Sequence, residues 1–388
     1  MTPDHRIGAA AGAFAAAFIA SQLVVGAALV TACSPDDTND PLPDADTGAL
    51  DGADVAADAS ASEDTTNLVE MWVSWPVPTI ATLRAVAAVP GKVGHYVLVG
   101  DGATVFYFDG AVFSDRSPTN VGAADLRAVW VADDGTIVAG GTGSSLVVWD
   151  GTTWSQAGEI PPTPAVRFED ISGRTATDIW AVGGSSEPSQ RAWHYDGEVW
   201  APVAVSVTDG DSGPLPGKAE FVAVKAAADG DVWLAASPGL KHAGVVLRGS
   251  GATAGGWTGH ALPIAARDLW ATGGGATAAA FVVGGALDDY VAHFDGEAFV
   301  QDEDVKWNLG FSAVAGTASD AVWVAGLKGQ LRRWDGKSWA VVDIKSPPGV
   351  VDAISTLTTD LIGIAVHDVG EYAVCDGIRL FRYGMQSL

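Results

Sequence analysis

The sequence is poor in cysteine and in positive charge. Only Cys33 and Cys375 occur in 388 residues, so we do not expect a disulfide framework. Cys375 lies in a predicted strand and is expected to be a small buried apolar residue. Lys and Arg number 21 against 47 Asp and Glu, which gives a formal net charge of −26. Binding to a phosphate backbone needs clustered basic side chains, so no nucleic-acid partner is expected.

The sequence also lacks the common catalytic and metal-binding motifs. H-x-x-x-H, C-x-x-C, H-E-x-x-H and G-x-S-x-G do not occur in it. His194 and His293 hold equivalent positions in the segments HYDG and HFDG, which indicates a shared strand register rather than a metal site. We therefore predict no cofactor, no metal and no catalytic residue.

The N-terminal residues 1–32 have the pattern of a secretory leader. Arg6 precedes an uncharged apolar run over residues 7–32, and the run ends directly at Cys33. The tetrapeptide Val30-Thr31-Ala32-Cys33 resembles the bacterial lipobox, and this resemblance implies that residues 1–32 are a lipoprotein signal peptide and that Cys33 carries lipid, such as palmitate. By the lipoprotein sorting pattern, Ser34 then indicates the outer membrane of the bacterial envelope. The alternative is an uncleaved membrane anchor, because the run is long enough to span a bilayer.

Residues 33–66 are expected to form a disordered acidic tether after the lipid. Residues 34–66 hold ten Asp or Glu, no Lys or Arg and no aromatic residue. Such a segment cannot bury enough apolar surface to offset its ordering entropy. Stretched out, it reaches at most ~110 Å.

A repeat of four short strands begins after residue 67. The predicted first strands start near Leu83, Leu126, Phe168, Phe221, Ala266, Phe311 and Leu361. A period of 40–50 residues with four strands in each unit is typical of a β-propeller. We predict an all-β, seven-bladed β-propeller over residues 67–388, with six or eight blades as the alternatives. The last unit lacks a fourth strand, so the strand at 67–79 is expected to complete it and close the ring.

An aromatic-Asp-Gly segment recurs in most units, as in LVVWDGTTWS at 146–155. Asp-Gly between alternating apolar residues predicts a two-residue hairpin turn. In that turn Trp149 would pair with Thr152, and Val147 with Trp154. The repeated aromatic residues are then expected to form the core between blades rather than a ligand site.

These repeats resemble the Trp- and Asp-Gly-rich propeller repeats of secreted bacterial lipoproteins and tectonin-type repeats, within the wider class of kelch- and WD-like propellers. The stretch DGDVWLAAS at 229–237 carries the tectonin likeness. The pattern departs from kelch repeats, which have a Gly-Gly followed by spaced Tyr and Trp. It also departs from the Asp-x-Gly-x-Thr-Trp spacing of sialidases, because Asp and Gly are adjacent in this chain.

Function on a propeller is expected in the loops, and the insertions gather at the end opposite the Asp-Gly turns. We predict that this end binds a protein or carbohydrate partner at the cell envelope, without catalysis, and that the lipid is the only membrane contact. The alternatives are a propeller enzyme, a glycosidase or lyase using acids in the central channel, and a purely structural envelope protein. The candidate ligand-binding residues are Asp288, Asp289, Tyr290, Asp302, Asp304 and Trp307.

Overall fold

The computed structural model describes most of the chain after residue 67. The described residues are 68–119, 124–215, 217–237, 243–250, 256–273, 278–285, 290–303, 305, 309–345, 357–367 and 370–387. The predicted signal peptide, Cys33 and the acidic tether lie outside them. Among the described residues, no helix combines the length and the apolar character needed to cross a bilayer.

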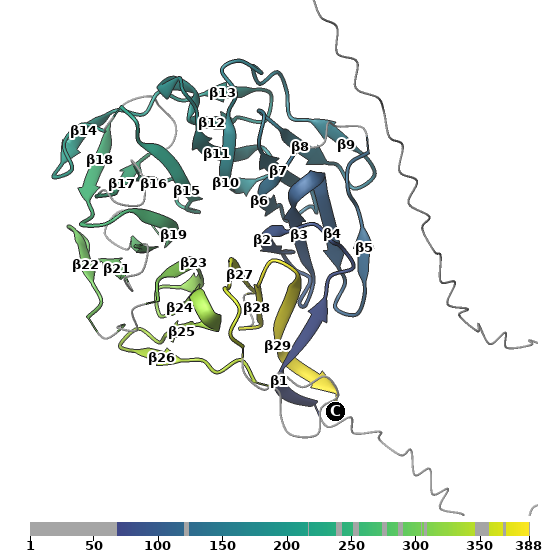
Figure 1. The fold of residues 1–388 in the computed structure, drawn as a ribbon. Helices are drawn as coiled ribbons and strands as arrows, with labels where there is room; N and C mark the ends of the chain where they lie inside the picture. Colours follow the sequence, from purple (N-terminus) through teal and green to yellow (C-terminus); the bar gives the residue numbers. More distant parts are fainter. Residues whose placement is uncertain are drawn as a thin grey trace, which may run out of the picture. The chain divides into compact units, whose positions relative to one another are not determined.

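Seven sheets form a ring, which confirms the predicted seven-bladed β-propeller (Figure 1). We number the blades by their inner strands, which contact one another around the centre. The inner strands are β2 (Leu83–Ala88), β6 (Leu126–Val131), β10 (Arg167–Thr175), β15 (Glu220–Ala226), β19 (Ala266–Thr272), β23 (Phe311–Ala318) and β27 (Gly363–Val366). The second strands are β3 (Tyr96–Gly100), β7 (Ile137–Gly141), β11 (Asp178–Gly184), β16 (Val232–Ser237), β20 (Ala279–Gly284), β24 (Ala321–Gly326) and β28 (Tyr372–Cys375).

The outer half of each blade is made of shorter strands. The third strands are β4 (Thr104–Phe108), β8 (Leu146–Trp149), β12 (Ala192–Tyr195), β17 (Val245–Gly249), β21 (Tyr290–Phe294), β25 (Leu331–Trp334) and β29 (Arg379–Ser387). The outermost strands are β5 (Phe113–Asp115), β9 (Trp154–Gln156), β13 (Trp200–Pro202), β18 (Trp257–Ala261), β22 (Phe299–Gln301), β26 (Trp339–Val341) and β1 (Leu68–Pro76). Blade 4 has a fifth strand that the sequence did not predict, β14 (Val207–Gly210), which pairs in parallel with β18.

The ring is closed by both ends of the described chain. β1 pairs with β29 in antiparallel register, from Leu68 opposite Ser387 to Pro76 opposite Arg379. The last blade is therefore built from β27, β28, β29 and the N-terminal strand β1. Pairing β29 with β1 covers an edge that would otherwise expose unpaired backbone groups.

The core lies between the blades. Seven clusters of buried side chains are present in the described residues, and each joins one blade to the next. One aromatic residue on the second strand of six of the blades is almost fully buried, as expected for the core between blades: Tyr96, Trp180, Trp233, Phe281, Trp323 and Tyr372. Each such ring removes roughly 150–250 Å² from water, which corresponds to about 4–6 kcal/mol of transfer free energy before entropic costs. Cys375 is also buried, and burial raises the pKa of its thiol to about 12.

The Asp-Gly turns are longer than predicted. Trp149 pairs with Trp154 rather than with Thr152, so Asp150 to Thr153 form a four-residue loop. The Asp150 carboxylate accepts the N–H groups of Thr152 at 2.8 Å and Thr153 at 2.7 Å, and hydrogen bonds from these two residues lower its pKa. Gly151 has a φ of +100°, which favours glycine. The two-residue turn was wrong because the Asp side chain satisfies the backbone of a longer loop. Trp149 and Trp154 still share a face, with ring centroids 5.6 Å apart.

Candidate functional site at the mouth of the central channel

β-Bulges near the start of the inner strands direct side chains into the central channel. In six blades the pairing of the inner strand with the second strand shifts by one residue at the same place. A bulge leaves its extra residue unpaired and turns its side chain away from the ladder. We call these six residues the channel mouth: Arg84, Arg127, Glu169, Val222, Arg267 and Ser312.

All six residues of the channel mouth line a cavity of about 1850 Å³. The wall also includes Ser185, Lys218 and Thr359 from the long connections, which lead from the second to the third strand and from one blade to the next. The cavity therefore reaches the end of the ring that carries the insertions, which we call the long-loop face. The basic residues of the wall are Arg84, Arg127, Arg167, Arg191, Lys218, Lys225 and Arg267. Seven of the chain's 21 Lys and Arg thus line this cavity, together with six Asp and Glu.

Two of the bulge arginines, Arg84 and Arg127, form ion pairs, and their carboxylate partners come from different parts of the fold. Arg84 holds Asp101 of its own blade with Nε–Oδ1 at 2.7 Å and Nη2–Oδ2 at 2.8 Å. This hydrogen bonding lowers the pKa of Asp101 and raises the pKa of Arg84. Arg127 pairs instead with Glu169, the bulge residue of the next blade, with Nε–Oε2 at 2.7 Å. A bulge arginine can thus take its carboxylate from the connection after the second strand or from the following bulge.

Arg267 differs from both. Its buried Nε has no hydrogen-bond partner in the described part of the chain, and its guanidinium forms no ion pair there. An unpaired buried donor costs free energy, because the water lost on burial is not replaced by an acceptor. Arg267 is therefore the basic group in the channel mouth that is best placed to gain a new anionic partner.

Deeper in the channel, two half-buried carboxylates flank a lysine. Asp170 of blade 3 and Asp268 of blade 5 lie on either side of Lys225 of blade 4. Burial raises the pKa of Asp170 to about 7 and that of Asp268 to about 8. Burial also lowers the pKa of Lys225, while the two carboxylates oppose that shift.

The same carboxylates connect neighbouring blades. Asp170 accepts the N–H of Ile171 and, across the blade interface, that of Val224, both at 2.8 Å. Asp268 repeats the arrangement with Leu269 and with Val314 of blade 6, again at 2.8 Å. Each carboxylate uses both oxygens to hold backbone groups, so it acts first as a structural link.

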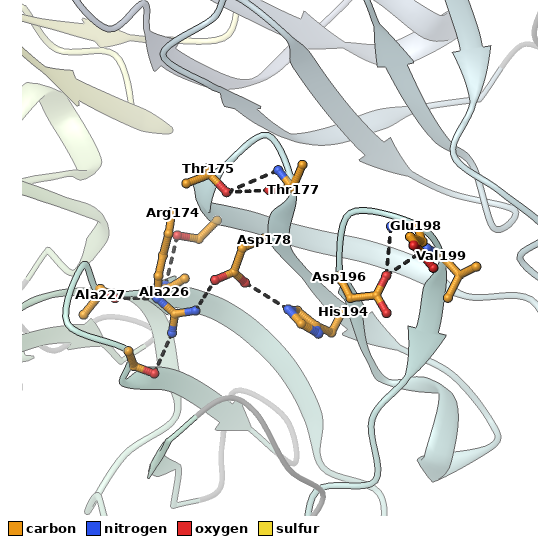
Figure 2. Close-up of polar contacts among 12 residues, drawn as sticks. Arg174, Thr175, Thr177, Asp178, His194, Asp196, Glu198, Val199, Ala226 and Ala227 are labelled. Carbon is orange, nitrogen blue, oxygen red and sulfur yellow. Dashed lines mark hydrogen bonds and ion pairs between the residues drawn. The ribbon is translucent and has the colours of Figure 1, made fainter.

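The opposite end of the ring carries a second polar cluster, shown in Figure 2. Asp178 accepts from Arg174 Nη1 at 2.6 Å and lies 2.9 Å from His194 Nε2. Arg174 also donates to the carbonyl oxygens of Ala227 and Gly230 in the next blade, each at 2.6 Å. This cluster ties blade 3 to blade 4. In the described residues no group of His, Cys, Asp and Glu is arranged to hold a metal ion.

Two of the residues predicted from the sequence as ligand-binding, Tyr290 and Asp302, are described, and neither lines the channel cavity. Tyr290 is only 3% exposed and packs in the core between blades 4 and 5. Asp302 turns inward and lies 2.9 Å from His293 Nδ1, while its N–H donates to the carbonyl of Val291. Four of the predicted residues lie outside the described residues: Asp288, Asp289, Asp304 and Trp307.

Sequence reasoning missed the bulge arginines. The sequence Leu-Arg-Ala-Val occurs twice, at 83–86 and at 126–129. The sequence Ala-Arg-Asp-Leu occupies the equivalent repeat position at 266–269. An Arg inside an otherwise apolar inner strand, recurring at one repeat position, was the available signal. The amino-acid sequence carries no signal for the shift in register between the inner and second strands, and this shift directs the three arginine side chains into the channel.

Comparison with known proteins identifies the fold. No protein-family model matches the chain, and no curated protein matches it in sequence. YCF48 from Cyanidioschyzon merolae is similar in structure, with a TM-score of 0.59 at 18% identity over 81% of this chain and 98% of that chain. A structure described as YCF48 bound to D1 peptide gives 0.58 at 15% identity, over 81% and 97% of the two chains. Virginiamycin B lyase from Staphylococcus aureus gives 0.58 at 12% identity, over 82% and 100%. Identities this low establish a shared propeller fold alone.

Proposed function

We propose that the chain is a lipid-anchored binding protein of the bacterial envelope, which takes a protein or carbohydrate partner at the channel mouth. The observation that carries this proposal is the convergence of six bulge residues on one end of a large cavity. A rigid ring positions these side chains, and the long connections around them offer additional contact surface. One of the similar structures is described as bound to a peptide, which is consistent with a propeller that holds a protein segment.

An enzyme is the second candidate, and one observation favours it. Asp170 and Asp268 have pKa values raised into the range where a carboxyl group can exchange protons near neutral pH. A lyase is also among the similar structures. Both carboxylates, however, hold backbone N–H groups of neighbouring strands, which accounts for their positions without catalysis. Turnover of a captured ligand that is lost in Asp268→Asn would favour the enzyme.

Site-specific crosslinking tests the binding site. A photo-crosslinking amino acid in place of Ser186, exposed at the long-loop face, is expected to capture the partner. The same amino acid in place of Lys337, exposed in an Asp-Gly turn at the other end, is the matched control. Capture from both positions alike would show that the long-loop face is not the site. Asp288, Asp289, Asp304 and Trp307 remain predicted contributors to this face.

The lipid anchor has a separate test. Lipidation requires the thiol of Cys33, so Cys33→Ser should leave the leader uncleaved and the protein unlabelled by a fatty-acid probe. Cys375→Ser is the control, because Cys375 is buried in the last blade and should not affect labelling. Equal labelling of the wild type and Cys33→Ser would rule out the lipoprotein.

A further inference from the structure

Within the described residues Arg267 has no carboxylate partner, and the two positions that supply one to Arg84 and Arg127 hold other residues in blades 5 and 6. In blade 1, Gly100 pairs with Leu83 and is followed by Asp101, which holds Arg84. In blade 5, Gly284 pairs with Ala266 in the same way and is followed by Gly285, which has no side chain. The second source of a carboxylate is the bulge residue of the following blade: Glu169 of blade 3 forms an ion pair with Arg127 of blade 2.

The bulge residue that follows Arg267 is Ser312 of blade 6. Ser312 Oγ donates to the carbonyl oxygens of Leu361 and Ala325, so its hydroxyl is directed to backbone acceptors. The carboxylate next to Arg267 in the sequence, Asp268, already accepts N–H groups with both oxygens. No acidic group of the described chain therefore fills the place beside Arg267 that Asp101 fills beside Arg84.

We infer that the ligand of the channel mouth is a protein segment that presents a carboxylate to Arg267. This inference rests on the proposed binding site and names its ligand class. The Arg84–Asp101 pair shows what this bulge position does with a carboxylate: Nε and a terminal nitrogen each hold one oxygen. The planar guanidinium matches a carboxylate in this two-point geometry.

Exposed aliphatic side chains on the rim favour a protein segment over a carbohydrate. Ile80 is fully exposed and Ile378 is 56% exposed, in the two connections where blade 7 meets blade 1. These connections are joined by hydrogen bonds from Val77 N to Ile378 O at 3.1 Å and from Leu83 N to Gly377 O at 2.8 Å. Gly377 also lines the cavity. Aliphatic side chains of a peptide can cover such a rim, whereas the hydroxyl groups of a sugar would lose water against it.

Fluorescence anisotropy with the full-length chain in detergent tests this inference. The probe is a labelled decapeptide of alternating Glu and Leu, and the matching Gln-Leu decapeptide keeps the aliphatic side chains without the charge. An oligogalacturonate represents an acidic carbohydrate. We expect the Glu-Leu peptide to bind the wild type, and Arg267→Gln to weaken that binding about tenfold or more. Arg333→Gln removes the same charge from an exposed position on β25, outside the cavity, and should leave binding unchanged.

A second variant adds the missing carboxylate within the chain. Ser312→Glu places an acid at the bulge position from which Glu169 holds Arg127, so it should compete with the peptide and also weaken its binding about tenfold. Equal binding of the Glu-Leu peptide to the wild type and to Arg267→Gln would overturn the inference, and so would equal binding of the Gln-Leu peptide. Binding of oligogalacturonate through Arg267, without binding of the peptide, would show an acidic carbohydrate ligand. In each of these cases, capture through position 186 would still support the site.

Discussion

At the scale of single residues, His293 and Asp302 form a hydrogen-bonded pair within blade 5. His293 also stacks on Trp334 of blade 6, with an interplanar angle of 23°. The hydrogen bond with Asp302 raises the pKa of His293. A pKa raised by folding means that the pair stabilises the fold fully below the unfolded pKa of about 6.5, and that this contribution is lost as pH rises through the folded pKa.

The pair therefore predicts a pH-dependent stability. Between about pH 5.5 and about pH 8.5, the wild type should lose more unfolding free energy than Asp302→Asn, by about 1 kcal/mol, because the variant lacks the charged partner. Urea unfolding at both pH values measures this difference. Parallel losses in the two proteins would show that the hydrogen bond does not favour the protonated imidazole.

At the scale of strands, the inner strands form an exposed edge along the channel, and Asp170 and Asp268 cap part of it. A strand edge leaves N–H groups without acceptors. The Asp170 carboxylate accepts one such group, the N–H of Val224 in the next blade. Ser172 does the same for the N–H of Ala226 at 3.1 Å. These bonds align β10 with β15, and the bond from Val314 to Asp268 aligns β23 with β19 in the same way, so they hold the bulges of these strands in place.

Removing one such link should be costly. Asp170→Ala is expected to lower the unfolding free energy by about 1–3 kcal/mol, because it leaves the N–H of Val224 without its acceptor. The pKa of Asp170 is raised to about 7, so its ionised form is less favourable in the fold. The loss should therefore shrink as pH rises through this value. Denaturant unfolding measures the loss, with the exposed Asp133→Ala as control. A loss no greater than that of the control would contradict the link.

The strands also show what the sequence could predict. The inner strands begin at or within two residues of the predicted starts, because strand alternation and Asp-Gly turns recur with a regular period. Local register was harder to predict. The Asp150 side chain lengthens its turn, and the bulges depend on pairing partners far along the chain. The N–H of Asp302 donates to the carbonyl of Val291 and so extends the pairing of β22 with β21 by one residue, which the sequence did not predict.

At the scale of the whole molecule, the ring depends on the strand that closes it. Trp72 of β1 is only 2% exposed and packs edge-on against Tyr372 of β28, with ring centroids 5.3 Å apart. It belongs to the cluster that joins blades 6 and 7. β1 thus supplies backbone pairing to one blade and side-chain packing to the interface beside it, and loss of the strand would affect both.

Deleting residues 67–79 from the full-length chain should therefore destabilise the propeller far more than an ordinary deletion does. The variant would expose the edge of β29 and the apolar side chains beneath Trp72, so it should aggregate or melt at a much lower temperature. An equally long deletion within the acidic segment, residues 50–62, is the control, and it should leave the melting curve of the propeller unchanged. Thermal unfolding with light scattering distinguishes the two. Identical melting of both deletions would mean that β29 is stable as an open edge, and that β1 is dispensable for the ring.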